Sequence, residues 1–236
     1  MITAPPSIID AALLDRLPLV LHEIEIAGRD WAIEAVADQS ALTAQADMFE
    51  HFPFGLLLWD SAPVLAGLLA ERPELVADKT VLEIGAGVGV AGLVAGYLGG
   101  RVRQTDHGRE ALALCRANAA RNGVTGLEWA LADWTDWHDD ARYDAIIGSD
   151  ILYEAEMYEP ISAIMARNLT PSGRVLLTDP GRSTTPRFVA LLEASGWRIA
   201  KRRKRLPAIA PTRPGETVVV TLIEAWRDEL VPTGKM

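Results

Sequence analysis

The sequence is poor in cysteine and histidine, the residues from which disulfides and many metal centres are built. Cys115 is the only cysteine among 236 residues, which excludes an internal disulfide framework and indicates a reducing compartment. The histidines His22, His51, His107 and His138 are scattered and show neither zinc-ligand spacing nor a recognisable pairing with the thiol. We therefore expect neither a metal site nor a cysteine nucleophile.

The chain also lacks an excess of basic residues and any long apolar run. It has 23 Lys and Arg against 32 Asp and Glu, a formal net charge of −9, which disfavours a nucleic-acid partner. No apolar run approaches the roughly 20 residues of a membrane span. The N-terminal residues MITAPPSIIDAALLDRL contain neither the basic start of a secretory signal nor an Arg-rich transit peptide. We expect a cytoplasmic monomer with no membrane or nucleic-acid partner.

From residue 79 onward, strand-like and helix-like segments alternate. The expected strands cover residues 80–86, 101–107, 127–133, 143–151, 173–181, 197–205 and 216–226. The expected helices cover residues 88–99, 108–123, 157–169 and 185–196. Such alternation predicts right-handed βαβ units, whereas the last two strands lack an intervening helix and should pair antiparallel. We therefore expect an α/β fold with a Rossmann-like, doubly wound sheet of seven strands, mostly parallel with an antiparallel last strand.

The first part of the chain differs in character. Residues 19–38 alternate apolar and polar side chains about a Gly-Arg-Asp turn, which predicts a β-hairpin. Residues 59–76 predict a helix capped by Asp60 or Ser61. We expect an N-terminal extension, residues 1–78, packed on a core of residues 79–236.

Four closely spaced glycines follow the first strand of the core in the stretch VLEIGAGVGVAGLVAG. A strand, a glycine turn and a helix N-terminus together present backbone N–H groups to a bound ligand. If the dinucleotide-binding pattern G-x-G-x-x-G begins at Gly85, its third glycine is replaced by Val90. If it begins at Gly87 the pattern matches, but the turn then starts two residues later than expected after the strand. The better fit is an acidic Glu83 followed by G-x-G-x-G, ending at Gly89. Glycines serving tight packing alone are the third interpretation.

Polar residues at the next strand ends decide between these interpretations. Asp106 ends the second strand, where a carboxylate can take both hydroxyls of a ribose, a feature that suits NAD equally well. Asp133 and Trp134 end the third strand in the stretch LADWTDW. In this order the features resemble class I S-adenosylmethionine-dependent methyltransferases, in which the glycine loop wraps the methionine moiety. The resemblance implies that Asp133 faces the adenine amino group and that Trp134 lies against the ring, although Trp134 taken alone fits core packing equally well.

The segment SDILYE, residues 149–154, narrows the resemblance. Asp150 and Tyr153 form D-x-x-Y, similar to the signature of the seven-strand protein-lysine methyltransferases called methyltransferase family 16. The segment 54–69 resembles the family's pre-core segment, although Trp59 is followed by aspartate where the family has proline. The stretch TDPGR, residues 178–182, is similar to the branch that modifies the electron-transfer flavoprotein β-subunit.

The resemblance implies S-adenosylmethionine as cofactor and assigns roles position by position. It places these residues at the cofactor: Trp59, Glu83, Gly85, Ala86, Gly87, Gly89, Asp106, Asp133, Trp134 and Ser149. It places Asp150 and Tyr153 at the methyl acceptor, whereas a helix N-cap is the alternative interpretation of Asp150. No metal is implied.

The acceptor class stays open at this point. The first hypothesis is a protein N-methyltransferase acting on lysine, the second a small-molecule N- or O-methyltransferase, and the third a non-catalytic cofactor-binding protein. Lysine would have to lose a proton, which costs on the order of 4–5 kcal/mol at neutral pH. The basic run 201–205 is interpreted as a solvated edge strand, with an acidic patch on a partner protein as the alternative.

Overall fold

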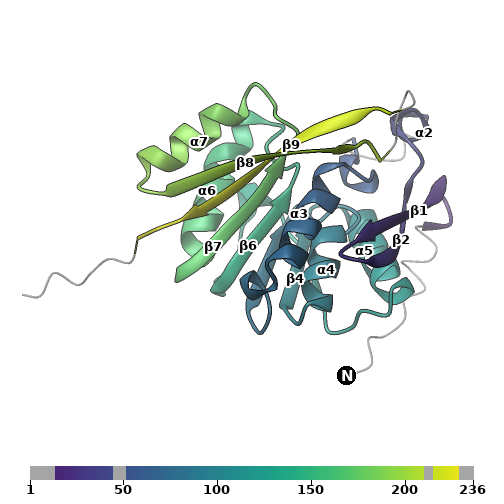
Figure 1. Cartoon of the computed structure of the whole chain (residues 1–236), viewed down its shortest axis with the longest axis horizontal. Helices are drawn as coiled ribbons and strands as arrows, with labels where there is room; N and C mark the ends of the chain where they lie inside the picture. Colours follow the sequence, from purple (N-terminus) through teal and green to yellow (C-terminus); the bar gives the residue numbers. More distant parts are fainter. Residues whose placement is uncertain (1–13, 45–51, 210–214, 229–236) are drawn as a thin grey trace, which may run out of the picture.

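The computed structural model describes residues 14–44, 52–209 and 215–228, and its centre is a seven-stranded sheet with helices on both faces (Figure 1). The spatial order is β5-β4-β3-β6-β7-β9-β8. The strands are β3 Thr80–Ile84, β4 Arg101–Asp106, β5 Glu128–Leu131, β6 Tyr143–Ser149, β7 Leu169–Asp179, β8 Arg198–Pro207 and β9 Thr217–Trp226. The first five run parallel, and β9 pairs antiparallel with both β7 and β8. The expected fold class is confirmed.

The central strands are buried on both faces because helices cover each side of the sheet. Along β3, Val81 joins one apolar cluster, whereas Leu82 and Ile84 join the other. The first cluster lies under α3 Ser61–Glu71, α4 Val90–Tyr97 and α5 Arg109–Arg121. The second lies under α6 Tyr158–Asn168 and α7 Thr185–Ala194. The shorter helices are α2 Gln39–Thr43, η2 Phe54–Leu56, η3 Pro73–Leu75, η4 Trp134–Asp136 and η5 Ala155–Met157.

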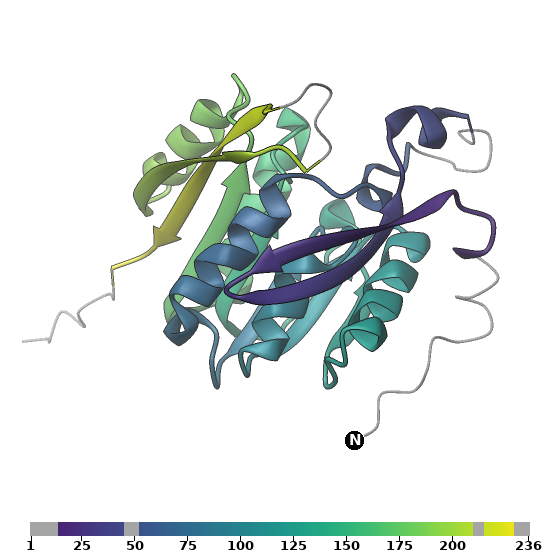
Figure 2. The same ribbon diagram turned by 45° about the vertical axis from the view of Figure 1, so that its right-hand side comes forward.

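The predicted hairpin is present as β1 Leu19–Ile26 and β2 Arg29–Val36. Its turn is Ala27–Gly28, with φ of 55° and 73°, and the partners Ile26 and Arg29 close it. The expected Gly-Arg-Asp turn was therefore placed too late, because a two-residue hairpin turn needs left-handed backbone that Gly28 supplies at its second position. Figure 2 shows the hairpin crossing the outer side of the helices on this face of the sheet.

Two asparagines, Asn118 in α5 and Asn122 directly after it, attach the hairpin to the core. Asn122 accepts from the N–H of Ala32 (3.0 Å) and donates to its carbonyl (2.8 Å). Asn118 accepts from the N–H of Glu34 (2.8 Å) and donates to its carbonyl (3.0 Å). These side-chain amides take the place of a neighbouring strand, so the polar edge of β2 is paired instead of exposed.

Helix α3 begins and ends differently from the expected helix over residues 59–76. Asp60 holds the N-cap position but makes no side-chain cap bond; its Oδ1 accepts from the backbone of Ile209 at 2.7 Å. Asp60 thus occupies the predicted N-cap position, but its carboxylate is used by a tertiary partner and does not cap the helix. The helix ends at Glu71 because Pro73 disfavours helical backbone at Arg72, whose φ is −134°.

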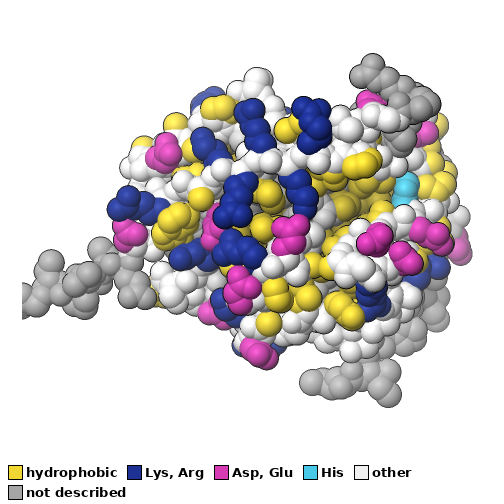
Figure 3. Space-filling view, in the orientation of Figure 1, with side chains coloured by type: hydrophobic (Ala, Val, Ile, Leu, Met, Phe, Trp, Pro, Cys, Tyr) yellow, Lys and Arg dark blue, Asp and Glu magenta, His cyan; other side chains and the backbone are white. Residues whose placement is uncertain are grey.

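Strand β8 carries the basic run on the outer edge of the sheet. Figure 3 shows Lys and Arg side chains gathered in the region of β8 and β9. Two residues of the run have side-chain partners: Lys204 Nζ forms an ion pair with Glu71 Oε1 at 2.9 Å, and Arg205 donates a hydrogen bond to Thr217 Oγ1 at 3.2 Å. Within the described ranges, no helix is long and apolar enough to cross a membrane.

Candidate active site

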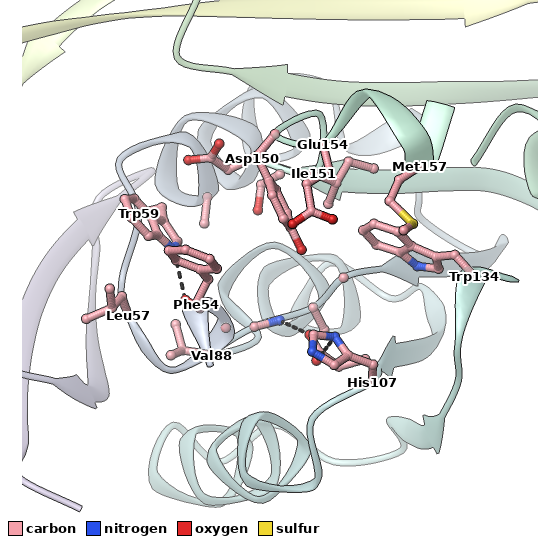
Figure 4. Close-up of a pocket in the computed structure, with 18 of the residues that line it drawn as sticks. Phe54, Leu57, Trp59, Val88, His107, Trp134, Asp150, Ile151, Glu154 and Met157 are labelled. Carbon is pink, nitrogen blue, oxygen red and sulfur yellow. Dashed lines mark hydrogen bonds and ion pairs between the residues drawn. The ribbon is translucent and has the colours of Figure 1, made fainter. Parts of the chain in front are cut away.

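A cavity of about 750 Å³ lies at the carboxyl ends of β3, β4 and β6, beside the first turn of α3 (Figure 4). This edge is where doubly wound sheets bind their ligands. All the predicted site residues except Glu83 and Gly89 line it: Trp59, Gly85, Ala86, Gly87, Asp106, Asp133, Trp134, Ser149, Asp150 and Tyr153. The fold therefore brings together residues that the sequence separates by more than 90 positions.

The glycine loop between β3 and α4 forms one wall of the cavity. Gly85 and Gly87 have φ of 65° and 55°, a backbone conformation that other residues rarely adopt. A Cβ on Gly85 would lie 2.8 Å from Ile151 Cγ2 and 3.0 Å from Trp134 Cζ2. The indole can therefore lie directly over this backbone only because the residue is glycine.

Glu83 lies beneath this loop and supports it, and Gly89 is the last residue of the loop before α4. The buried carboxylate of Glu83 accepts from the N–H of Gly92 (3.1 Å) and from Gln104 Nε2 (2.7 Å), which also donates to the carbonyl of Gly89 (3.0 Å). Burial raises the pKa of Glu83 to about 7, against the opposing effect of these hydrogen bonds. Because its side chain points toward α4, Glu83 does not reach the cavity that it was expected to line.

Two residues of α5 hold the same loop from the other side. Cys115 Sγ donates to the carbonyl of Gly87 at 3.2 Å, and Asn118 Nδ2 donates to the carbonyl of Val88 at 2.9 Å. Burial raises the pKa of the Cys115 thiol well above its usual range. The loop is thus fixed by groups that were not predicted to take part, because helix periodicity alone does not show what α5 faces.

Asp106 ends β4 with its carboxylate directed at the glycine loop. Its Oδ2 accepts from the N–H of Gly87 and its Oδ1 from the N–H of Gly108, both at 2.9 Å. His107 Nδ1 lies 3.5 Å from Oδ1. Each carboxylate oxygen has a second acceptor position. Asp106 is therefore oriented by the backbone and keeps the capacity to accept two further hydroxyl groups.

Asp133 and Trp134 lie at the far side of the cavity. Asp133 Oδ1 accepts from Thr135 N (2.7 Å) and Thr135 Oγ1 (2.8 Å), and these hydrogen bonds lower its pKa. Figure 4 shows the Trp134 indole beside the sulfur of Met157, across the cavity from Trp59 and Phe54. This arrangement leaves an apolar slot between aromatic rings.

The pre-core segment contributes the opposite side. Trp59 Nε1 donates to the carbonyl of Phe54 at 3.0 Å, and the Phe54 ring centroid lies 5.9 Å from that of Tyr153. Gly55 packs directly on the glycine loop, since a Cβ added to Gly87 would lie 3.2 Å from the carbonyl oxygen of Gly55. Phe54 was not predicted as a site residue, although it is the first residue of the pre-core segment 54–69.

Asp150 lies just after β6 and forms an ion pair that the sequence did not reveal. Arg182 Nη1 donates to Asp150 Oδ1 and lies 3.4 Å from Asp179 Oδ2. Burial raises the pKa of Asp150, and the adjacent guanidinium opposes this shift. The N-cap interpretation of Asp150 is wrong, because η5 is preceded by Glu154 and α6 by Met157.

Tyr153 stands at the rim, with 37% of its surface exposed. Partial burial raises its pKa to about 12, and nearby carboxylates, Glu154 first, add to the shift. At neutral pH its hydroxyl is therefore protonated. It can donate or accept a hydrogen bond but cannot act as a base.

Comparison with known proteins assigns this arrangement to a family. A family model described as lysine methyltransferase matches residues 36–194, which include every predicted site residue. The chain belongs to the lysine methyltransferase family. The resemblance drawn from D-x-x-Y and the glycine loop is thereby confirmed, whereas the narrower likeness to the flavoprotein branch stays a prediction.

Curated relatives of the chain have names that specify different methyl acceptors, arginine in one and lysine in another. The chain is 34% identical over 114 residues to "Histone-arginine methyltransferase METTL23" of Xenopus laevis, covering 46% of this chain and 49% of that protein. It is 35% identical over 109 residues to "Protein N-lysine methyltransferase METTL21A" of Danio rerio, covering 43% and 50%. The chain thus spans about half the length of the curated relatives it matches.

Solved structures show the same fold at low sequence identity. A precorrin-6y C5,15-methyltransferase from Geobacter metallireducens aligns with a TM-score of 0.58 and 22% identity, over 71% of this chain and 87% of that one. A ribosomal protein L11 methylase from Lactobacillus delbrueckii aligns with a TM-score of 0.52 and 22% identity, over 69% and 77%. For this lysine methyltransferase family member, the family and the fold imply S-adenosylmethionine as methyl donor.

The cavity fits that cofactor. The close approach of Trp134 to Gly85 provides an aromatic surface for a purine, and Asp106 has acceptor positions left for a ribose diol. The cavity also contains several carboxylates, which suit a ligand that carries a sulfonium and an ammonium group.

Proposed function

We propose that this chain is an S-adenosylmethionine-dependent protein N-methyltransferase that acts on lysine. One observation carries the proposal: Asp150 and Tyr153 line the same cavity as the glycine loop and Asp106. Family membership supports the reaction class, and the family's description supports lysine. A non-catalytic cofactor-binding protein would not need an acceptor pair at this position.

In this proposal the cofactor would be held by residues that line the cavity. Asp106 would accept hydrogen bonds from the ribose hydroxyls, Trp134 and Met157 would face the adenine, and Trp59 and Ser149 would contact the methionine moiety. When bound, the cofactor supplies the methyl group and a positive charge. The chain's own contribution is to exclude water and to fix the geometry, since an in-line methyl transfer needs no covalent intermediate with the protein.

Asp150 and Tyr153 would hold the acceptor amine between them. The Asp150 carboxylate attracts the cationic side chain and accepts an N–H, and the Tyr153 oxygen accepts a second N–H. With both N–H bonds directed to the protein, the nitrogen lone pair would be left free for the methyl group. The protonated state of the Tyr153 hydroxyl suits this role, because a phenolate would hold the ammonium form.

Lysine fits this pair better than arginine, which one relative's name specifies. A single carboxylate and a single hydroxyl suit one nitrogen, whereas a guanidinium is a planar fork that is usually held by bidentate carboxylates. Asp150 already gives one oxygen to Arg182 and has one left. Arginine and small-molecule amines are therefore alternative outcomes of the test.

The test uses labelled methyl groups and a lysate of the source cell. The lysate is divided by a filter that retains proteins, and each half is incubated with the purified chain and methyl-labelled S-adenosylmethionine. We expect label in the retained half, recovered as methyl-lysine after acid hydrolysis, and none with heat-inactivated chain. Label on arginine would correct the acceptor residue, and label confined to the filtrate would overturn the protein-substrate proposal.

We further propose that the chain works as a cytoplasmic monomer without nucleic-acid or membrane partners. The net charge of −9 supports the exclusion of nucleic acid. The division into residues 1–78 and 79–236 also stays a prediction.

A further inference from the structure

The charged residues around the cavity are mostly carboxylates. Asp106, Asp133, Asp150 and Glu154 line it, and Arg182 is the only Arg or Lys among the described lining residues. That single fixed cation lies beside Asp150, the predicted acceptor residue.

Arg182 is held in place by its main chain and by its side chain. Asp179 at the end of β7 is fully buried, and its Oδ1 accepts from the N–H of Gly181 (2.7 Å), the N–H of Arg182 (2.9 Å) and Thr185 Oγ1 (2.8 Å). Asp179 Oδ2 lies 3.4 Å from Arg182 Nη1. The same carboxylate thus fixes the turn and receives the guanidinium, so the position of Arg182 follows from the end of β7.

The pair between Arg182 and Asp150 uses only one carboxylate oxygen. Nη1 donates to Oδ1, and no described residue donates to Oδ2. The Asp150 side chain is 7% exposed, so a free oxygen on it is directed into the protein's own cavity and not into bulk water. Asp150 therefore keeps one acceptor oxygen for a second N–H group while remaining paired.

The surrounding carboxylates oppose the step that the acceptor must make. An amine attacks a methyl group only after it has lost its proton, and every nearby negative charge holds that proton. Such charges surround both members of the acceptor pair: Asp60 before α3 and Asp179 at the end of β7 act on Asp150. Glu154 before η5 and Asp106 at the end of β4 act on Tyr153. Arg182 is the positive group on the protein that counters them at this place.

On the basis of the proposed function, we infer that Arg182 is a positioning residue of the acceptor subsite. It holds Asp150 through one oxygen and leaves the other oxygen for the acceptor nitrogen. Its charge offsets the carboxylates, so the amine loses its proton to solvent more readily. The nitrogen lone pair then forms the new N–C bond while the methyl–sulfur bond breaks, and the sulfur keeps that electron pair.

The first test needs neither cofactor nor acceptor. The carboxyl carbon of Asp150 is followed by ¹³C NMR in the full chain and assigned by comparison with Asp150→Asn. We expect the pKa of Asp150 to be higher by about one unit or more in Arg182→Gln than in the wild type, the scale of losing one adjacent charge. Arg182→Lys should restore most of the shift. Arg187→Gln, an exposed arginine on α7, is the matched control and should leave the titration unchanged.

The second test is the pH dependence of methyl transfer to the retained lysate fraction. The rate of methyl transfer should rise with pH as the acceptor amine loses its proton. The midpoint of this rise is an apparent pKa that belongs to the coupled pair of Asp150 and the amine. We expect Arg182→Gln to raise this midpoint by about one to two pH units. The rate should fall about tenfold or more near neutral pH and recover at alkaline pH. Arg182→Lys should restore the midpoint, and calorimetry should show unchanged affinity for S-adenosylmethionine in all variants.

The outcomes separate this inference from the proposed function. An unchanged Asp150 titration in Arg182→Gln, an equal loss of rate at every pH, or a loss of cofactor affinity would each overturn the role of Arg182. No label with the wild-type chain would overturn the proposed function, and the Asp150 titration would still show whether Arg182 holds the carboxylate.

Discussion

Glu83 is a buried carboxylate that stabilises the glycine loop and couples the fold to pH. Burial raises its pKa from 4.5 to about 7, so between these values the folded chain binds more protons than the unfolded chain. The contribution to stability is fully present below the lower value and is lost as pH rises through the higher one. The loss amounts to roughly 3 kcal/mol in the free energy of unfolding.

Glu83→Gln should remove this part of the pH dependence, because an amide takes up no proton. We expect the wild-type free energy of unfolding to fall more between pH 5 and pH 8 than that of the variant, by roughly 2–3 kcal/mol. Urea titrations of both proteins at each pH measure the difference, in which the contributions of other titrating groups cancel. Equal changes in the two proteins would show that Glu83 titrates normally in the fold.

At the scale of single residues, the sequence indicated which residues line the cavity but not which side chains pair with them. Asp150 and Tyr153 could be predicted because the ends of parallel strands meet at one edge of the sheet. The pairing of Asp150 with Arg182 could not, since it spans 32 positions and depends on the turn that Asp179 fixes. The direction of Glu83 was equally hidden, because an acidic residue in a strand is ordinarily expected to reach solvent or ligand.

Among the elements, α5 connects the hairpin to the glycine loop through one side chain. Asn118 bonds the backbone of Glu34 in β2 and the carbonyl of Val88 in the loop, whereas Asn122 bonds only to β2 and its own helix. The two asparagines thus form a natural comparison, because one reaches the cofactor loop and the other does not.

Asn118→Ala should destabilise the chain by about 2–4 kcal/mol, because it leaves buried backbone groups without partners. It should also weaken S-adenosylmethionine binding, since Val88 loses its contact. Asn122→Ala should lower stability but leave cofactor affinity within a few-fold. Urea denaturation and calorimetry measure both quantities, and equal cofactor affinities in the two variants would contradict a link through Asn118.

The expected elements agree with the seven strands of the sheet, with the antiparallel pairing of the last strand and with most helices. Alternating apolar segments predicted the core strands because burial on both faces leaves a clear pattern. Asp60 holds the predicted N-cap position of α3 but makes no capping hydrogen bond, because its carboxylate accepts from Ile209, which is 149 residues away. The C-terminal end of α3 could have been predicted from Pro73. In contrast, η2, which contains Phe54, has only three residues and is too short to show a periodic pattern of apolar side chains.

At the scale of the whole molecule, the segment before residue 79 contributes a helix, α3, to the hydrophobic core. Helix α3 buries Leu65 and Leu69 in the cluster that also contains Val81 of the sheet. Thr178 Oγ1 in β7 donates to the carbonyl of Ser61 at 2.9 Å. Removing α3 would expose an apolar face of the central strands.

A fragment of residues 79–236 should therefore fail to fold, whereas residues 52–236, which keep α3 and lack the hairpin, should fold with reduced stability. Thermal unfolding by circular dichroism and the dispersion of amide NMR signals distinguish the two fragments. Cooperative unfolding of residues 79–236 would instead support a core that is independent of the first 78 residues.

The single thiol of the chain, that of Cys115, is buried under the glycine loop and donates a hydrogen bond to the carbonyl of Gly87. Burial raises its pKa and so suppresses formation of the thiolate. Thiolates, not thiols, react with alkylating reagents and oxidants. The native protein consequently offers no competing sulfur to maleimide dyes or spin labels. A cysteine introduced at an exposed position would be the one site open to thiol-directed reagents, without prior removal of Cys115.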